Sequence, residues 1–178
     1  VVSLVGENGS GKTTLIKSLV GILPLTEGQV EWFSEKDEPL IIRNYSGTRK
    51  KPQPFGLTLQ SDGVCGEEKV TERLITALNV SGIDCSQLEA KQILEEWGMS
   101  HRGEDRVSQL SAGLRRRLAV ISGMAPAMLC GSPRIVFLDE PSEGLDSFSK
   151  GVLKKWISEL SQYGNAVVIA SHDEEIIS

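Results

Sequence analysis

The sequence has few cysteines, no long apolar run and no excess of positive charge. The cysteines, Cys65, Cys85 and Cys130, are scattered, and they follow neither a disulfide framework nor a zinc-binding pattern. No run of about 18 apolar residues occurs, so we expect that the chain does not cross a membrane by itself. The formal net charge of -5 disfavours a broad nucleic-acid-binding surface.

An initiating methionine and a secretory signal peptide are also absent. Residues 1–5 already have the pattern of a core strand, so we expect the chain to be truncated at its N-terminus. Its 178 residues, 39% of them hydrophobic and 24% charged, suit one compact domain with its own core.

Strands and helices are predicted to alternate along the chain, which indicates an α/β fold with a mainly parallel central sheet. Strands are expected at residues 1–5, 29–33, 55–59, 135–138 and 166–170, and helices at 13–20 and around 152–160. Residues 36–54 carry weak strand signals and are interpreted as a small antiparallel arm. Residues 86–89 fit a capping box, and the spacing after them places Ala90, Leu94 and Trp97 on one helix face.

A glycine-rich loop follows the first strand. Residues 6–13 read G-E-N-G-S-G-K-T and match the pattern G-x-x-x-x-G-K-[ST]. Glycines let the backbone N–H groups point at phosphate oxygens, and the next helix offers its N-terminus. Lys12 is expected to reach the β and γ phosphates, and the Thr13 hydroxyl to bind Mg²⁺. The predicted nucleotide contacts here are Gly6, Asn8, Gly9, Ser10, Gly11, Lys12, Thr13 and Thr14.

Two carboxylates, Asp139 and Glu140, stand where the apolar run 135–138 ends. Ligands of open α/β sheets bind at the carboxyl ends of the strands. Asp139 can therefore orient Mg²⁺ through water, and Glu140 can act as the general base that polarises an attacking water. Together with the phosphate loop, the pair predicts hydrolysis of a nucleoside triphosphate.

These motifs, in this order, resemble the nucleotide-binding domain of ABC ATPases over nearly the whole chain. Gln60, after the strand 55–59, resembles the Q-loop glutamine that touches Mg²⁺ and the attacking water. His172, after the strand 166–170, resembles the H-loop histidine that contacts the γ-phosphate. The resemblance implies catalytic roles for Glu140, His172 and Gln60, and a Mg²⁺ site made of Thr13, Gln60 and Asp139.

Residues 110–114, L-S-A-G-L, resemble the LSGGQ signature of this family. The resemblance implies that Ser111 and Gly113 bind the ATP of the opposite subunit in a head-to-tail dimer. Ala112 and Leu114 depart from the signature, and the loss of one hydrogen bond to the ribose would weaken affinity by roughly tenfold at most. Residues 142–146 resemble the D-loop, which crosses the same dimer interface.

The resemblance also implies a P-loop NTPase fold with a core at 1–60 and 131–178 and an inserted helical subdomain at about 67–130. Residues 1–178 are expected to form a single domain. The aromatic residue that stacks on adenine in this family would lie upstream of Val1. The Ala125-Pro126 pair lies in a segment longer than usual, which predicts a lengthened loop before the catalytic strand.

The leading functional prediction is the ATPase subunit of a transporter. Its implied partners are a second ABC ATPase domain, identical or different, and a polytopic transmembrane subunit at the cytoplasmic face of a membrane. The run L-S-A-G-L-R-R-R-L resembles the daunorubicin-type drug-export branch and favours export. Residues 115–117, three arginines, are interpreted as a solvated or interface surface rather than a nucleic-acid patch.

The main alternative is a soluble ABC protein of the translation-factor or DNA-repair type. A chromosome-organising ATPase would need a long coiled coil between Gln60 and Leu110, and that segment is short and lacks sustained heptads. A binding module with little hydrolysis is a third class, against which Glu140 and His172 argue.

Overall fold

Four parallel strands form the main sheet of the computed structural model, which describes residues 1–33, 40–50, 54–61, 64–132 and 134–177. The strands are β1 (Val2–Leu4), β4 (Gly56–Thr58), β5 (Ile135–Asp139) and β6 (Ala166–Ala170), in the order β1-β6-β5-β4. Every neighbouring pair is parallel. The predicted parallel sheet is confirmed, with β1 and β4 shorter than expected.

A separate antiparallel pair consists of β2 (Gln29–Trp32) and β3 (Leu40–Asn44). The strand β2 matches the strand expected at residues 29–33, and β3 lies within the predicted arm at residues 36–54. Residues 36–39 and 51–53 of that arm lie outside the described residues. Trp32 meets Phe55 edge to face with ring centroids 5.6 Å apart, and Phe55 meets Phe137 in the same way at 6.0 Å. These rings join the hairpin to the main sheet.

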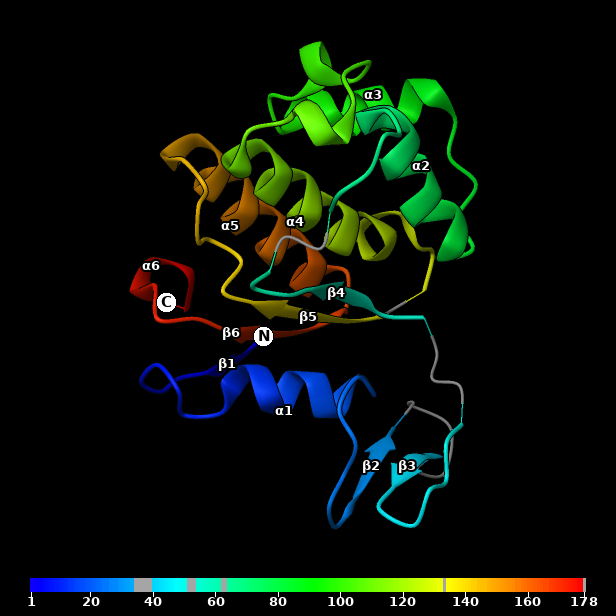
Figure 1. The fold of residues 1–178 in the computed structure, drawn as a ribbon, viewed down its shortest axis with the longest axis vertical. Coiled ribbons are helices and arrows are strands. Elements are labelled where there is room, and N and C mark those ends of the chain that lie inside the picture. Colours follow the sequence, from blue (N-terminus) through cyan, green and yellow to red (C-terminus); the bar gives the residue numbers. More distant parts are fainter. Residues whose placement is uncertain (34–39, 51–53, 62–63, 133, 178) are drawn as a thin grey trace.

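Helices cover both faces of the main sheet (Figure 1). The helix α1 (Lys12–Leu19) lies on one face, and α4 (Ala112–Leu129) and α5 (Ser147–Gln162) lie on the other. The helices α2 (Val70–Val80) and α3 (Gln87–Glu96) pack beyond α4, and 3₁₀ turns follow at Ser100–Arg102 and Val107–Gln109; the last helix is α6 (Glu174–Ile177). None of the helices in the described ranges has the length and apolar character needed to cross a bilayer.

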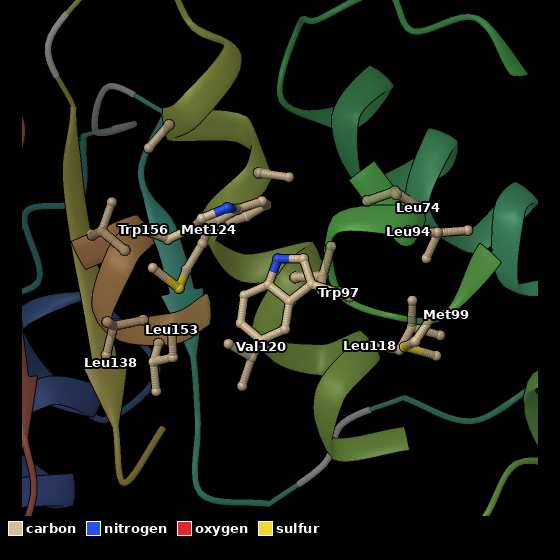
Figure 2. Close-up of a cluster of buried hydrophobic side chains, with 14 of the residues drawn as sticks. Leu74, Leu94, Trp97, Met99, Leu118, Val120, Met124, Leu138, Leu153 and Trp156 are labelled. Atoms are coloured by element: carbon tan, nitrogen blue, oxygen red, sulfur yellow. The ribbon is translucent and has the colours of Figure 1, made fainter. Parts of the chain in front are cut away.

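The alternation of side chains along β5 divides the core into two clusters. Val136 and Leu138 face the cluster shared with α2 to α5, whereas Phe137 faces the α1 side. Trp97, at the end of α3, meets Trp156 of α5 edge to face with ring centroids 5.2 Å apart (Figure 2). The core of the sheet therefore continues without interruption into the helical region.

The helix α4 packs directly on the strand β4 because two glycines face each other. A Cβ atom on Gly123 would overlap the Thr58 hydroxyl, and one on Gly56 would overlap the Gly123 carbonyl oxygen. The two backbones can approach this closely only without side chains. This contact fixes the helix that begins at residue 112 against the strand that leads to Gln60.

The prediction of a lengthened loop around Pro126 is wrong, because the helix α4 continues past this proline to Leu129. Proline removes one helical hydrogen bond and normally kinks or ends a helix. Here Ala125, Pro126 and Ala127 are all buried in the core. Burial of this apolar turn outweighs the lost hydrogen bond, so the extra residues lengthen a helix.

Candidate active site

The phosphate-loop motif forms a turn that enters α1. Gly9 and Gly11 have φ values of 83° and 96°, a region that favours glycine, and Gly11 is the N-cap of the helix. The Lys12 ammonium donates to the carbonyl oxygens of Gly6 at 2.7 Å and Glu7 at 3.1 Å. An ammonium has three donors, so it keeps one for an incoming anion.

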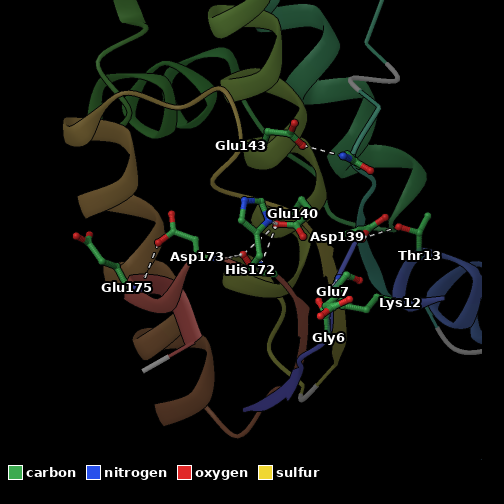
Figure 3. A network of polar contacts seen from close by, with 12 residues as sticks. Gly6, Glu7, Lys12, Thr13, Asp139, Glu140, Glu143, His172, Asp173 and Glu175 are labelled. Carbon is green, nitrogen blue, oxygen red and sulfur yellow. Dashed lines mark hydrogen bonds and ion pairs between the residues drawn. The ribbon is translucent and has the colours of Figure 1, made fainter. Parts of the chain in front are cut away.

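Asp139 lies across from the start of α1, at the end of β5. The Thr13 hydroxyl donates to Asp139 Oδ1 over 3.1 Å (Figure 3). Asp139 is fully buried, and its Oδ2 atom has no hydrogen-bond partner. A buried carboxylate oxygen without a partner is costly, and a cation or a cation-bound water would satisfy it. The residues at this position therefore fit Mg²⁺.

The three predicted metal-binding residues line one pocket of about 300 Å³. Its lining consists of Thr13, Lys17, Leu59, Gln60, Ser61 and Asp139. Within the described residues, no group of three or more His, Cys, Asp or Glu side chains gathers around a possible metal position. Mg²⁺ commonly uses one or two carboxylates and completes its shell with substrate phosphates and water, which matches this sparse set.

Glu140 is held in a constrained conformation next to Asp139. Its φ of 45° is the one positive value among the described non-glycine residues. Its side chain is 7% exposed, and Oε2 accepts from the Ser171 hydroxyl at 3.1 Å and from the His172 N–H at 3.3 Å. Strained backbone of this kind costs about 1–3 kcal/mol and persists where the surroundings enforce it.

The His172 ring faces the same carboxylate, with Nδ1 3.0 Å from Glu140 Oε2 (Figure 3). The Glu140 side chain raises the pKa of His172, first through the hydrogen bond and then through its charge, and the charge of Glu143 adds to the effect. The imidazole is 63% exposed, so it can also reach a ligand from solvent. The structure thus brings together the predicted base and the predicted γ-phosphate contact.

We predict that Glu140→Gln will lower the pKa of His172, because the substitution removes the negative charge that favours the imidazolium. In the unchanged chain, His172 should hold its proton to higher pH than a free imidazole does. An NMR titration of the imidazole signals, with His101 as the second assigned histidine, measures both midpoints. Equal His172 midpoints in the two proteins would contradict this assignment of the cause.

The signature residues lie at the start of α4, apart from this pocket. Ser111 caps the helix by accepting the Leu114 N–H over 3.3 Å, and Ser111, Ala112 and Gly113 are exposed. Leu114, which replaces the glutamine of the family signature, packs against the main core cluster. Neither Ser111 nor Gly113 lines the pocket that contains Asp139.

The interpretation of the three arginines as a solvated or interface surface is wrong for Arg116, which is 3% exposed. Its guanidinium donates to five backbone carbonyl oxygens, those of Leu59, Gln60, Asp139, Glu140 and Glu143. Helical periodicity could have revealed this, because Arg116 lies on the same face of α4 as Val120 and Gly123, which are both buried.

Arg117 and Glu143 make two further contacts that sequence reasoning missed. Arg117 donates to Asp146, the N-cap residue of α5, over 2.8 Å. The Gln60 amide donates to Glu143 Oε2 over 3.0 Å. Both contacts join residues far apart in the chain, so local patterns carry no signal for them.

Known proteins are similar to this chain in both sequence and fold. Residues 1–143 match the family model described as ABC transporter. The ergothioneine transport ATP-binding protein EgtV of Helicobacter pylori strain G27 is 30% identical over 176 residues, which are 97% of this chain and 76% of that protein. Among solved structures, an ABC transporter ATP-binding protein from Pyrococcus furiosus has a TM-score of 0.71 at 25% identity, covering 97% of this chain and 78% of its own.

A structure named RNase-L Inhibitor also has a TM-score of 0.71 at 25% identity. The match covers 99% of this chain but 30% of that protein. The family match over residues 1–143 and the alignment with EgtV over 97% of this chain agree with the fold of the ABC transporter ATP-binding protein. The chain therefore belongs to the ABC transporter family, as an ATP-binding and ATP-hydrolysing domain.

Proposed function

We propose that this chain is the motor subunit of a transporter, pairing head to tail with a second ABC ATPase domain around two Mg²⁺·ATP. The second domain can be an identical or a different chain. The observation that carries the proposal is the pocket in which Thr13, Gln60 and Asp139 meet, with an unpartnered buried oxygen on Asp139.

The phosphate loop supplies the binding energy for the triphosphate. The N-terminus of α1 carries about half a positive charge, and the third donor of Lys12 is available to the β and γ phosphates. Thr13, Gln60 and Asp139 would hold Mg²⁺ through oxygen atoms. Such an ion would supply positive charge against the negative charge that develops on the phosphates.

Glu140 acts as the general base. It accepts a proton from water as the water oxygen bonds to the γ-phosphorus, and the bond from that phosphorus to the bridging oxygen of ADP breaks. Ser171 and the His172 backbone hold the Glu140 carboxylate in place. In the free protein, the His172 imidazole also contacts the Glu140 carboxylate. We infer that the γ-phosphate draws the imidazole away and so frees the carboxylate to act as the base.

The exposed start of α4 is the surface for the second ATPase domain. Ser111 and Gly113 present backbone N–H groups at a helix N-terminus, where an anion is favoured. A polytopic membrane subunit would dock on the helical region of residues 67–130, with 1–60 and 131–178 forming the core. In this proposal the chain lies on the cytoplasmic face of a membrane, and the signature resemblance favours export.

A soluble ABC protein is the second candidate function. The RNase-L Inhibitor structure, whose name does not describe a transporter, has the same TM-score as the Pyrococcus furiosus ABC transporter ATP-binding protein, and the match covers 30% of its chain. Such a protein would pair its ATPase domains without a membrane partner, so a binding partner distinguishes the two candidates.

We expect the chain to bind a fluorescent ATP analogue in the presence of Mg²⁺, and Lys12→Ala to weaken this binding by roughly tenfold or more through loss of a charge-assisted contact. Fluorescence titration of both proteins measures the effect. A folded chain without affinity for nucleotide would overturn the site.

Affinity purification from a detergent extract should recover a polytopic membrane protein, and recovery of ribosomes or DNA in its place would overturn the transporter assignment.

A further inference from the structure

An exposed carboxylate, Glu143, holds the side-chain amide of Gln60. Gln60 Nε2 donates to Glu143 Oε2 over 3.0 Å. Gln60 follows β4, and Glu143 lies in the turn after β5, so the bond joins the ends of two neighbouring strands. Gln60 also lines the pocket with Thr13 and Asp139.

The chemistry of this bond fixes which way the amide faces. An ionised carboxylate only accepts hydrogen bonds, so it must face the NH₂ group of the glutamine rather than its oxygen. The carbonyl oxygen Oε1 is then the atom left for other partners. Of the two ends of the amide, only this oxygen can coordinate a divalent cation, since hard cations bind through oxygen ligands.

The same arginine supports both ends of the bond. Arg116 donates to the backbone carbonyl oxygens of Gln60 at 3.3 Å and of Glu143 at 3.2 Å. The two residues are therefore held near each other before their side chains meet. Side chains on a fixed backbone lose less freedom when they pair, which makes an exposed hydrogen bond more effective.

We propose that Glu143 is a positioning residue that turns the Gln60 amide so that its oxygen, and not its nitrogen, is offered to the divalent cation bound with Thr13 and Asp139. The inference rests on the proposed function of this site. Glu143→Gln tests it, because a neutral amide can face Gln60 with either end and no longer selects one orientation.

The readout is the gain in nucleotide affinity that Mg²⁺ produces. We would titrate a fluorescent ATP analogue with excess Mg²⁺ and again with EDTA. The ratio of interest is the Kd in EDTA divided by the Kd in Mg²⁺. Glu143→Gln should reduce this ratio by about two- to tenfold, the range of one hydrogen bond, and leave the Kd in EDTA unchanged. Glu95→Gln, an exposed position on α3, is the matched control and should leave both values unchanged.

A double-mutant cycle separates orientation from charge, because Glu143→Gln also removes a negative charge near the site. In a Gln60→Ala background, Glu143→Gln should have no further effect on the ratio. The proposal is overturned if Glu143→Gln changes the ratio equally in the Gln60→Ala background, or if Glu143→Gln alone does not change it. Either result would leave ATP binding itself intact. An unchanged chain that binds no nucleotide overturns the proposed function as well.

Discussion

Replacing Glu140 with glutamine should lower steady-state ATP turnover by about 10²-fold or more and leave ATP affinity nearly unchanged. The amide has almost the same shape as the carboxylate but cannot take a proton from water. Its oxygen can still accept from the Ser171 hydroxyl, so the turn should keep its geometry. The measurements are phosphate release at saturating Mg²⁺·ATP and the Kd of a fluorescent ATP analogue.

The exposed Glu95 of α3 supplies a matched substitution for this comparison. Glu95→Gln makes the same chemical change far from the phosphate loop in sequence and should retain full turnover. If Glu140→Gln also retained it, the general base would be another group. A fall in affinity as large as the fall in turnover would instead point to a disturbed site.

Much of the site could be predicted from the sequence because its signals are local. The loop from Gly6 to Thr13 needs glycines at fixed spacing, and the strand before Asp139 is a short apolar run. The capping box at Ser86 is likewise local, and its serine does accept the Glu89 N–H. In each case neighbouring residues determine the backbone, and the backbone determines where the functional group points.

The contacts that sequence reasoning missed depend on tertiary packing. Three consecutive arginines look alike in sequence, but in the described residues it is Arg116 that bonds the backbone of Gln60 and Glu140, just after β4 and β5. Pro126 has a strong local preference against a helix interior, and burial in the core overrides it. Local propensities cannot report such outcomes, since the deciding contacts come from residues distant in the chain.

Replacing Arg116 with lysine should destabilise the chain by about 2–4 kcal/mol, because one ammonium cannot reproduce the planar set of donors. Arg116 donates to the carbonyl oxygens of Asp139 and Glu140, which belong to the two peptide groups on either side of the Glu140 Cα atom. It thereby holds Glu140 at its positive φ. A looser turn should also lower kcat by roughly tenfold. Urea unfolding and phosphate release measure these two effects.

The neighbouring arginine distinguishes this role from a general need for positive charge on α4. Arg115 donates to the Leu110 carbonyl oxygen, which lies outside the catalytic strands. Arg115→Lys should therefore cost less than about 1 kcal/mol and leave kcat unchanged. Since Lys12 and the loop glycines lie on a different segment, nucleotide affinity measured in EDTA should change little in Arg116→Lys while kcat falls. Equal losses in both variants, or a loss of affinity alone, would mean that Arg116 does not position the catalytic turn.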